Sequence, residues 1–364
     1  MSSHCYGHGG NIQQEANRLG IKMDEILDAS ASIVPFKCSK KLRNYLKKAL
    51  SSHYINNYPD RTHQGLKEAI SKWHQIDTEM VLPGNGASEL FTWAARDASE
   101  NGISGIPTPG FSDYARALRC WNANFLHIPL PLNWSKKTPQ NFPIYPQTNV
   151  LWITNPHNPT GQLWSKDSLK VLLEKYNLII CDEAFLPLVP NGEEQSLIPL
   201  TKTNKNLIVI RSLTKLLSIP GLRLGYAISS PERLRNWSQL RDPWPLNGLA
   251  IATGQKVMSD INGLTSWIKK TEKWVSKEGP WLYSNLKDIP GICPLPSSTN
   301  FLLIKGKSSL IALKEQAEAS SILLRDCRSF EGLNNKYLRI SLQKRKENKR
   351  IVSTIKKIMK KFDQ

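Results

Sequence analysis

Short apolar runs alternate with stretches of helical periodicity through the middle of the chain. These runs do not alternate polar and apolar residues, which is typical of strands buried on both faces of a sheet. Strands separated by helices indicate a mainly parallel sheet, and therefore an α/β fold. We expect a strand, a glycine-rich turn and a helix at 79–98, a strand and a loop at 149–161, a helix at 165–177, a buried strand at 178–185, a strand and a loop at 206–215, and a strand at 223–229.

The pattern changes near residue 250, where a helical segment with few breakers leads through residues 287–306 into shorter strands and a basic C-terminal stretch. This change predicts a second, smaller α/β domain. The N-terminal segment could join either domain. We predict an N-terminal arm and lead-in at residues 1–50, a large domain at 51–250 and a small C-terminal domain at 251–364.

The chain of 364 residues carries a formal net charge of +19, and much of this surplus lies in residues 342–364. A basic surplus can indicate a nucleic-acid partner. Here apolar residues recur at helical spacing between the lysines, so an amphipathic helix with a solvated basic face explains the charge better. No nucleic-acid-binding motif is recognisable, and we expect no such partner. The apolar stripe predicted to dock this helix consists of Ile351, Ile355, Ile358, Met359 and Phe362.

Composition and cysteine usage narrow the class of protein. Hydrophobic residues make up 40% of the chain and charged residues 22%, as in ordinary globular proteins. No apolar run approaches the roughly 20 residues needed to cross a bilayer, and the first residues do not resemble a secretory signal. We therefore expect a cytoplasmic protein with no membrane partner. Six scattered cysteines without a CxxC pair predict reduced, mostly buried thiols and no metal site.

The glycine-rich turn after the first predicted strand has the composition of an anion-binding site. Gly84 and Gly86 follow that strand, and Ser88 opens the next helix. Unpaired backbone N–H groups and the helix dipole favour a phosphate at such a position. Most glycine-rich turns are simply turns, however, and this one matches neither the P-loop nor the dinucleotide-binding pattern.

Two further motifs follow predicted strands. Asp182 and Glu183 come directly after the apolar run at 178–181, at the edge of a parallel sheet where α/β proteins bind ligands. They are interpreted either as a cap of the next turn or as a counter-ion for a positive group on a ligand. Asn155 and Asn158 lie within two X-Pro steps, which predicts a rigid loop that is either a surface turn or a hydrogen-bonding partner for a ligand.

Lys215 also follows a predicted strand, and Arg223 comes eight residues later. A lysine held away from water beside another cation has a lowered pKa and can bond an aldehyde, while an arginine can bind a phosphate with two nitrogens. On composition alone, a surface lysine is the simpler interpretation. The four motifs together change this, because an anion site, an amide, a strand-end carboxylate and a strand-end amine are the groups that a phosphorylated pyridine aldehyde requires.

Three stretches resemble the main motifs of fold-type I pyridoxal-phosphate enzymes, the aspartate aminotransferase superfamily: NPHNPTG at 155–161, CDEAF at 181–185 and SLTKLLSIPGLRLGY at 212–226. Their order agrees with that family, as do the 33 residues from Asp182 to Lys215. The resemblance implies an α/β fold with a mainly parallel seven-stranded sheet in a large domain, and a smaller C-terminal α/β domain. It also implies pyridoxal 5'-phosphate as the cofactor and a homodimer with shared active sites.

The resemblance further implies roles for individual residues. Lys215 and Asp182 would be the catalytic residues, since Lys215 resembles the lysine that binds the cofactor aldehyde and Asp182 the carboxylate that pairs with the ring nitrogen. Asn158 resembles the residue that bonds the phenolic oxygen, and Tyr58 the tyrosine that reaches the cofactor phosphate of the neighbouring subunit. The other cofactor contacts implied are Gly86, Ala87, Ser88, Ser212 and Arg223 at the phosphate and Phe111 against the ring.

Both ends of the chain resemble one branch of this superfamily, the threonine-phosphate decarboxylases of cobalamin biosynthesis. These enzymes convert L-threonine O-3-phosphate into (R)-1-amino-2-propanol O-2-phosphate and carbon dioxide. The stretches that carry the resemblance are residues 8–33 and LLRDCRSFEGLNNKYLRISL at 323–342. They imply a small phosphorylated amino-acid substrate. The substrate contacts implied are His8, Gly9, Gly10, Asn158, Arg325 and Arg339.

Two alternatives stay open. Histidinol-phosphate aminotransferases share the fold, the cofactor and a phosphorylated substrate, and the outcome depends on which Cα bond stands perpendicular to the cofactor ring. Ser32 and Val34 occupy positions where the decarboxylases usually have asparagine, on the substrate side. The second alternative is that the protein uses this fold for regulation or nucleic-acid binding. The intact set of Lys215, Asp182 and Asn158 disfavours it.

Overall fold

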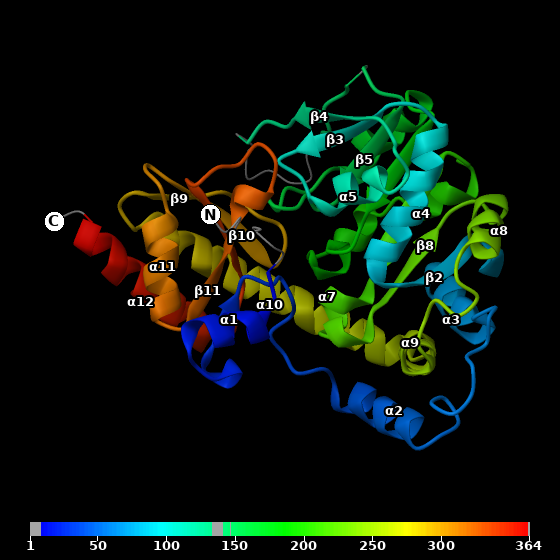
Figure 1. The fold of residues 1–364 in the computed structure, drawn as a ribbon, viewed down its shortest axis with the longest axis horizontal. Helices are drawn as coiled ribbons and strands as arrows, with labels where there is room; N and C mark the ends of the chain where they lie inside the picture. Colours follow the sequence, from blue (N-terminus) through cyan, green and yellow to red (C-terminus); the bar gives the residue numbers. More distant parts are fainter. Residues whose placement is uncertain (1–8, 133–140, 146, 363–364) are drawn as a thin grey trace.

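The computed structural model describes residues 9–132, 141–145 and 147–362 of the chain. His8, a predicted substrate contact, lies outside these residues. Two β-sheets, one of seven strands and one of five, stand beside each other with helices packed against both (Figure 1).

The larger sheet holds strands from the first two thirds of the chain. They are β2 (Val81–Asn85), β3 (Ser104–Thr108), β4 (Phe125–Pro129), β5 (Val150–Thr154), β6 (Leu178–Asp182), β7 (Leu207–Ser212) and β8 (Leu224–Ile228). Their order is β2-β8-β7-β6-β5-β3-β4, and only the pairs made by β8 are antiparallel. The predicted mainly parallel, seven-stranded sheet is confirmed.

Helices cover both faces of this sheet, which explains the continuous apolar runs of its strands. Along β5, Leu151 and Ile153 face one hydrophobic core, while Val150 and Trp152 face the other. One face is covered by α3 (Gln64–His74), α6 (Lys166–Lys170), α7 (Leu213–Leu217) and α9 (Gly248–Ser259). The opposite face is covered by α4 (Gly86–Glu100), α5 (Asp113–Arg119) and α8 (Pro231–Leu240).

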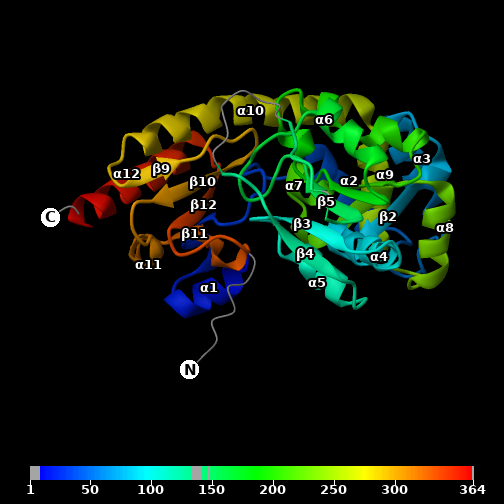
Figure 2. The same cartoon turned by 90° about the horizontal axis from the view of Figure 1, so that it is seen from above.

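The smaller sheet combines the C-terminal part of the chain with one strand from the N-terminal part. Its strands are β1 (Leu27–Ala29), β9 (Ile292–Pro294), β10 (Phe301–Gly306), β11 (Ile322–Asp326) and β12 (Tyr337–Ser341). The order is β1-β11-β12-β10-β9, with β1 parallel to β11 and the other pairs antiparallel. The 27-residue helix α10 (Ile261–Lys287) runs along both sheets, and α11 (Ile311–Ala319) and α12 (Arg345–Phe362) complete this part (Figure 2).

The N-terminal segment divides between the two sheets. Helix α1 (Ile12–Leu19) is tied to α11 by an ion pair of 2.8 Å between Arg18 and Glu318, and β1 joins the smaller sheet. Helix α2 (Lys40–Leu50) packs instead against α9, beside the larger sheet. The domain limits at residues 50 and 250 stay predictions.

The C-terminal helix α12 docks largely as its pattern predicts. Ile351, Ile355, Ile358 and Met359 are buried, and α12 packs against α10 and α11. Phe362 was expected in the same stripe but is 46% exposed, because the last turn of the helix extends beyond its neighbours.

Two expectations about local structure need correction. The helix expected at 165–177 consists of α6 and a 3-10 turn from Val171 to Glu174, a tightening that is common at helix ends. Strand β6 ends at Asp182 rather than at residue 185, because the chain turns there into the next 3-10 helix.

Cysteine burial also differs from expectation. The five described cysteines are free, but Cys120 and Cys293 are exposed, Cys38 is half-buried, and only Cys181 and Cys327 are buried. Cys120 follows the end of α5, and Cys293 lies on an edge strand with its side chain outward, so neither position faces a core.

The described ranges contain neither a membrane-spanning helix nor a metal-binding cluster of side chains. No helix there is long and apolar enough to cross a membrane. No group of three or more histidine, cysteine, aspartate or glutamate side chains is arranged to hold a metal ion in that part of the chain.

Candidate active site

A cavity of about 220 Å³ lies between the two sheets, at the carboxyl ends of strands in the larger one. Most of the predicted site residues line it, although they come from segments far apart in sequence. The predicted residues in its wall are Gly9, Ala87, Ser88, Phe111, Asn158, Asp182, Ser212, Lys215, Arg223, Arg325 and Arg339. The structure thus brings these side chains together, and their individual roles stay predictions.

The turn between β2 and α4 has the geometry expected of an anion cradle. Gly86 begins α4 with a φ of 74°, a left-handed conformation that glycine adopts without steric cost. A Cβ at this position would collide with the guanidinium group of Arg223. Ala87 and Ser88 face the cavity from the first turn of α4, where unpaired backbone N–H groups and the helix dipole favour a phosphate.

Asp182 is the last residue of β6, and each of its carboxylate oxygens accepts a hydrogen bond. Tyr114 donates a hydrogen bond of 2.6 Å to Oδ2, and the backbone N–H of Ala184 donates one of 2.9 Å to Oδ1. Burial raises the pKa of Asp182 to about 6, and the hydrogen bond from Tyr114 opposes this rise. The carboxylate is therefore poised to take a positively charged partner in the cavity.

Lys215 lies in the short helix α7, where its half-buried side chain reaches the cavity. Burial, together with the guanidinium groups of Arg339 and Arg223, lowers the pKa of its amine to about 8. Within the described residues, the amine has no hydrogen-bond or ion-pair partner, and it lies 5.8 Å from the centre of the Phe185 ring. A substantial neutral fraction of this amine near neutral pH makes it a nucleophile.

The loop with Asn155 and Asn158 is buried, so its interpretation as a surface turn is wrong. Asn155 exchanges hydrogen bonds with the backbone of Trp164, at 2.9 and 3.2 Å, which fastens the loop to the protein. Asn158 faces the cavity, and its Oδ1 accepts a hydrogen bond from Nη1 of Arg339. The loop thereby connects the larger sheet to β12 of the smaller one.

Arg339 and Arg325 bring two buried positive charges to the side of the cavity formed by the smaller sheet. Phe330 lies between them, with its ring centre 5.7 Å from Cζ of Arg339 and 5.3 Å from Cζ of Arg325. Nε of Arg339 is buried without a hydrogen-bond partner in the described structure. Burial, with a smaller contribution from Arg325, lowers the pKa of Arg339 to about 10, so an anion in the cavity would stabilise both charges.

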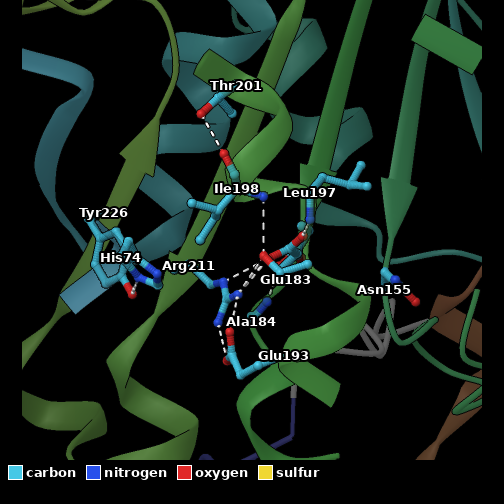
Figure 3. Close-up of polar contacts among 12 residues, drawn as sticks. His74, Asn155, Glu183, Ala184, Glu193, Leu197, Ile198, Thr201, Arg211 and Tyr226 are labelled. Atoms are coloured by element: carbon cyan, nitrogen blue, oxygen red, sulfur yellow. Dashed lines mark hydrogen bonds and ion pairs between the residues drawn. The ribbon is translucent and has the colours of Figure 1, made fainter. Parts of the chain in front are cut away.

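Glu183 has a different environment from its neighbour Asp182. It forms an ion pair of 2.7 Å with Arg211, and both side chains are almost fully buried. Arg211 also binds both carboxylate oxygens of Glu193, at 2.7 and 2.9 Å (Figure 3). Because Glu183 and Arg211 directly adjoin Asp182 and Ser212, this network fixes two strand ends beneath the cavity. Glu183 is accordingly not available as a counter-ion for a ligand.

Three of the predicted residues that the structure describes lie outside the cavity wall. Gly86 is directly behind it, against Arg223, and Gly10 donates its backbone N–H to Oγ of Ser30 at 3.2 Å. Tyr58 is 78% exposed and stacks on Trp244 with ring centres 4.3 Å apart. His8 lies outside the described residues.

Sequence reasoning missed Tyr114 and Ser30. Tyr114 holds Asp182 from the first turn of α5, and Phe111 lies three residues earlier, just before this helix begins. Ser30 lines the cavity and offers its backbone oxygen to Arg339 at 3.3 Å. No local signal in the sequence distinguishes either residue.

A separate cavity of about 250 Å³ lies among α2, α7, α9 and α10. Lys41 and Asp260 in its wall form an ion pair of 2.5 Å with each other, and Lys270 packs over the rings of Phe36 and Trp267. It therefore lacks the unpartnered reactive groups that the smaller cavity contains.

The smaller cavity fits a phosphorylated pyridine aldehyde. The first turn of α4 offers an anion site, Asp182 offers a buried carboxylate for a ring nitrogen, and Lys215 offers an amine without a partner. These are the groups by which such a cofactor is held and oriented.

Comparisons with known proteins agree with this fit. The family model for aminotransferase class I and II matches residues 24–355. Threonine-phosphate decarboxylase of Salmonella typhimurium is 31% identical over 97% of this chain and 96% of its own length. Histidinol-phosphate aminotransferase of Methanothermobacter thermautotrophicus is 26% identical over 96% of this chain and 93% of its own.

Among solved structures, L-threonine-O-3-phosphate decarboxylase from Porphyromonas gingivalis has a TM-score of 0.80 at 24% identity, over 92% of this chain and all of that one. Histidinol-phosphate aminotransferase from Clostridium acetobutylicum has a TM-score of 0.82 at 23% identity, with the same coverage. These likenesses confirm the fold. With the family match across most of its length, the chain belongs to the aminotransferase class I and II family of pyridoxal-phosphate-dependent enzymes.

Proposed function

We propose that the protein decarboxylates L-threonine O-3-phosphate to (R)-1-amino-2-propanol O-2-phosphate, a step of cobalamin biosynthesis. The pair of buried arginines, Arg325 and Arg339, carries this proposal. An amino-acid phosphate brings two anionic groups, a carboxylate and a phosphate, whereas histidinol phosphate brings one. Two cations at one end of the cavity therefore match the amino-acid phosphate better. The similarity to the Salmonella typhimurium decarboxylase supports the same choice.

In this proposal, the cofactor residues have the roles that the family resemblance implies. Lys215 binds the cofactor aldehyde, Asp182 pairs with the ring nitrogen, and Asn158 bonds the phenolic oxygen. The first turn of α4, with Ser212 and Arg223, holds the phosphate. When bound, the cofactor withdraws the electron pair that remains at Cα after a bond to this carbon breaks.

The substrate side would determine which bond breaks. Arg339 and Arg325 would bind the carboxylate and the phosphate and so fix the rotation about Cα. The rings of Phe185, Phe301 and Phe330 surround this region and exclude water, which favours the departure of a carboxylate as neutral carbon dioxide. Lys215, with its pKa near 8, is suited to return a proton from Nζ to Cα.

We further propose that the enzyme is a homodimer in which Tyr58 completes the partner's site. The loop of Tyr58 is anchored on Trp244, since Arg61 also packs over that ring with its Cζ 4.1 Å from the centre. Tyr58 itself remains largely exposed, and it does not line the cavity of its own chain. An ordered but exposed aromatic ring supports a contact with a second copy.

The test is to incubate the purified holoenzyme with L-threonine O-3-phosphate and no oxo acid. Release of carbon dioxide in stoichiometric amounts with the amine product is expected. Turnover of histidinol phosphate that requires 2-oxoglutarate, without release of carbon dioxide from threonine phosphate, would instead identify an aminotransferase.

A further inference from the structure

Arg241 is a buried arginine that contacts the phosphate cradle from outside the cavity wall. It follows α8 with a side chain only 3% exposed. Its Nη1 donates a hydrogen bond of 2.7 Å to the backbone oxygen of Pro83, three residues before Gly86. It has no place in the proposed reaction, because it does not line the cavity.

Glu89 connects the same arginine to the other end of the turn. One carboxylate oxygen, Oε1, lies 3.8 Å from Nη1 of Arg241. The other, Oε2, accepts the backbone N–H of Asn85 at 2.6 Å. Arg241 therefore holds the backbone oxygen of Pro83, where the chain enters the turn. Through Glu89 it also positions the backbone N–H of Asn85, directly before Gly86. A small movement of either group would turn the N–H groups of the first turn of α4 away from a bound phosphate.

His63 holds the second terminal nitrogen of Arg241. Nη2 of Arg241 lies 3.4 Å from Nδ1 of His63, so Nδ1 accepts and the ring proton is on Nε2. Burial, with Arg241 nearby, lowers the pKa of His63 to about 4, and the ring is neutral at physiological pH.

The position of His63 is unfavourable in two ways. Nε2 is buried without a partner among the described residues, and the backbone is left-handed, with a φ of 51°. Both features cost free energy, and an apolar residue that only filled the space would avoid the first of them. Contact with Arg241 gives a reason to retain a histidine here.

We propose that Arg241 is a positioning residue for the cofactor phosphate, and that His63 keeps Arg241 in position. Binding of pyridoxal phosphate then depends on Arg241, although this residue does not reach the phosphate. Binding of pyridoxal, which lacks the phosphate, does not.

The experiment compares two aldehydes on the full-length apoprotein. Pyridoxal phosphate and pyridoxal are titrated separately into Arg241→Met, and binding is followed by absorbance. We expect pyridoxal phosphate to bind on the order of tenfold more weakly, the effect of one charge-assisted hydrogen bond. Pyridoxal should bind within about twofold of the wild-type protein. An equal loss for both aldehydes, or no loss for either, would overturn the proposal.

Arg233→Met is the matched control. Arg233 lies on α8, the helix that Arg241 follows, and bonds Asp97 at 2.7 Å, near the opposite end of α4 from the cradle. The same chemical change there should lower the melting temperature and leave the ratio of the two affinities unchanged. A change of the ratio equal to that of Arg241→Met would show a general effect of loosening α4 and contradict the role of Arg241.

If Arg241→Met does not fold, a pair of variants at His63 tests the same proposal. Asparagine tolerates the left-handed backbone and places an oxygen near the position of Nδ1, whereas leucine removes the acceptor. His63→Leu should weaken binding of pyridoxal phosphate about threefold and leave pyridoxal unaffected, and His63→Asn should restore it. Identical affinities in the two variants would contradict the proposal. Cofactor affinity does not depend on the reaction that follows, so failure here leaves the proposed decarboxylation untouched.

Discussion

The two sides of the cavity are built on different principles. On the side of the larger sheet, Asp182 has a hydrogen-bond donor for each carboxylate oxygen, and the residues beneath it are tied together by the ion pair of Glu183 and Arg211. On the side of the smaller sheet, Arg325 and Arg339 are two like charges close together, and Nε of Arg339 has no partner in the described structure. The side of the larger sheet therefore holds its geometry without a ligand. On the side of the smaller sheet, an anionic ligand would reduce the repulsion between the two guanidinium groups.

This difference assigns separate tasks to the two sides. A satisfied network holds its geometry whichever substrate is present, as a cofactor site requires. A pair of buried cations favours an anionic ligand, so we propose that the choice of substrate resides there. Substitutions of the cavity-lining residues on the first side should strongly reduce turnover, and substitutions of those on the second should change substrate affinity.

The largest effect is expected from Lys215→Ala. Removal of the amine eliminates both the attachment of the cofactor and the group suited to proton transfer, so carbon dioxide release should fall by at least about a thousandfold. Lys175→Ala, at an exposed lysine, is the control and should retain full activity. Retention of activity in Lys215→Ala would contradict the assignment of the whole cavity.

Asp182 and Glu183 offer a test within the first side itself. Asp182→Asn should reduce turnover by about two orders of magnitude, because a buried counter-ion for the cofactor is lost. Glu183→Gln should leave most of the turnover and instead lower the free energy of unfolding by about 2 kcal/mol, since a buried hydrogen bond between charged groups is weakened. Measurements of turnover and of thermal unfolding on both variants distinguish the loss of activity from the loss of stability. The reverse pattern would mean that the wrong carboxylate has been assigned to the cavity.

The second side is tested by Arg325→Gln, with Arg328→Gln as the neighbouring control. Loss of one charge-assisted contact should raise KM for threonine phosphate about tenfold to a hundredfold, with cofactor absorbance unchanged. Arg328 is paired with Asp326 at 2.6 Å and does not line the cavity, so its replacement should leave KM unaltered. A fall in kcat alone for Arg325→Gln would move this arginine from binding to chemistry.

The sequence predicted the first side better than the second, for a physical reason. The positions at which strands end are local features of the sequence, so the motifs at Asp182, Ser212 and Lys215 could be placed at one sheet edge in advance. Alternation along a strand predicts that Asp182 and Glu183 point to opposite sides, but not which of them faces the cavity. That choice depends on Arg211, which lies 28 residues beyond Glu183.

Burial was harder to predict than position. The loop of Asn155 and Asn158 has the composition of a surface turn, yet it is covered because β12 brings Arg339 against it from 181 residues away. Likewise, Tyr114 reaches Asp182 across 68 residues. Contacts of this kind arise from packing between elements far apart in the sequence, which no local pattern encodes.

The smallest expected effect is electrostatic. Arg339, on the side of the smaller sheet, lowers the pKa of Lys215, on the side of the larger sheet. The neutral form of the Lys215 amine attacks an aldehyde, so the rate of cofactor capture by the apoprotein should rise with pH and level off above about 8, the lowered pKa of this amine. Arg339 is the largest charged contributor to that lowering, after burial. Arg339→Met should therefore move the midpoint to higher pH and slow capture a few-fold at pH 7, because less of the amine is neutral there. Stopped-flow absorbance measures both quantities. A midpoint that stays in place, or moves to lower pH, would mean that the two sides are electrostatically independent.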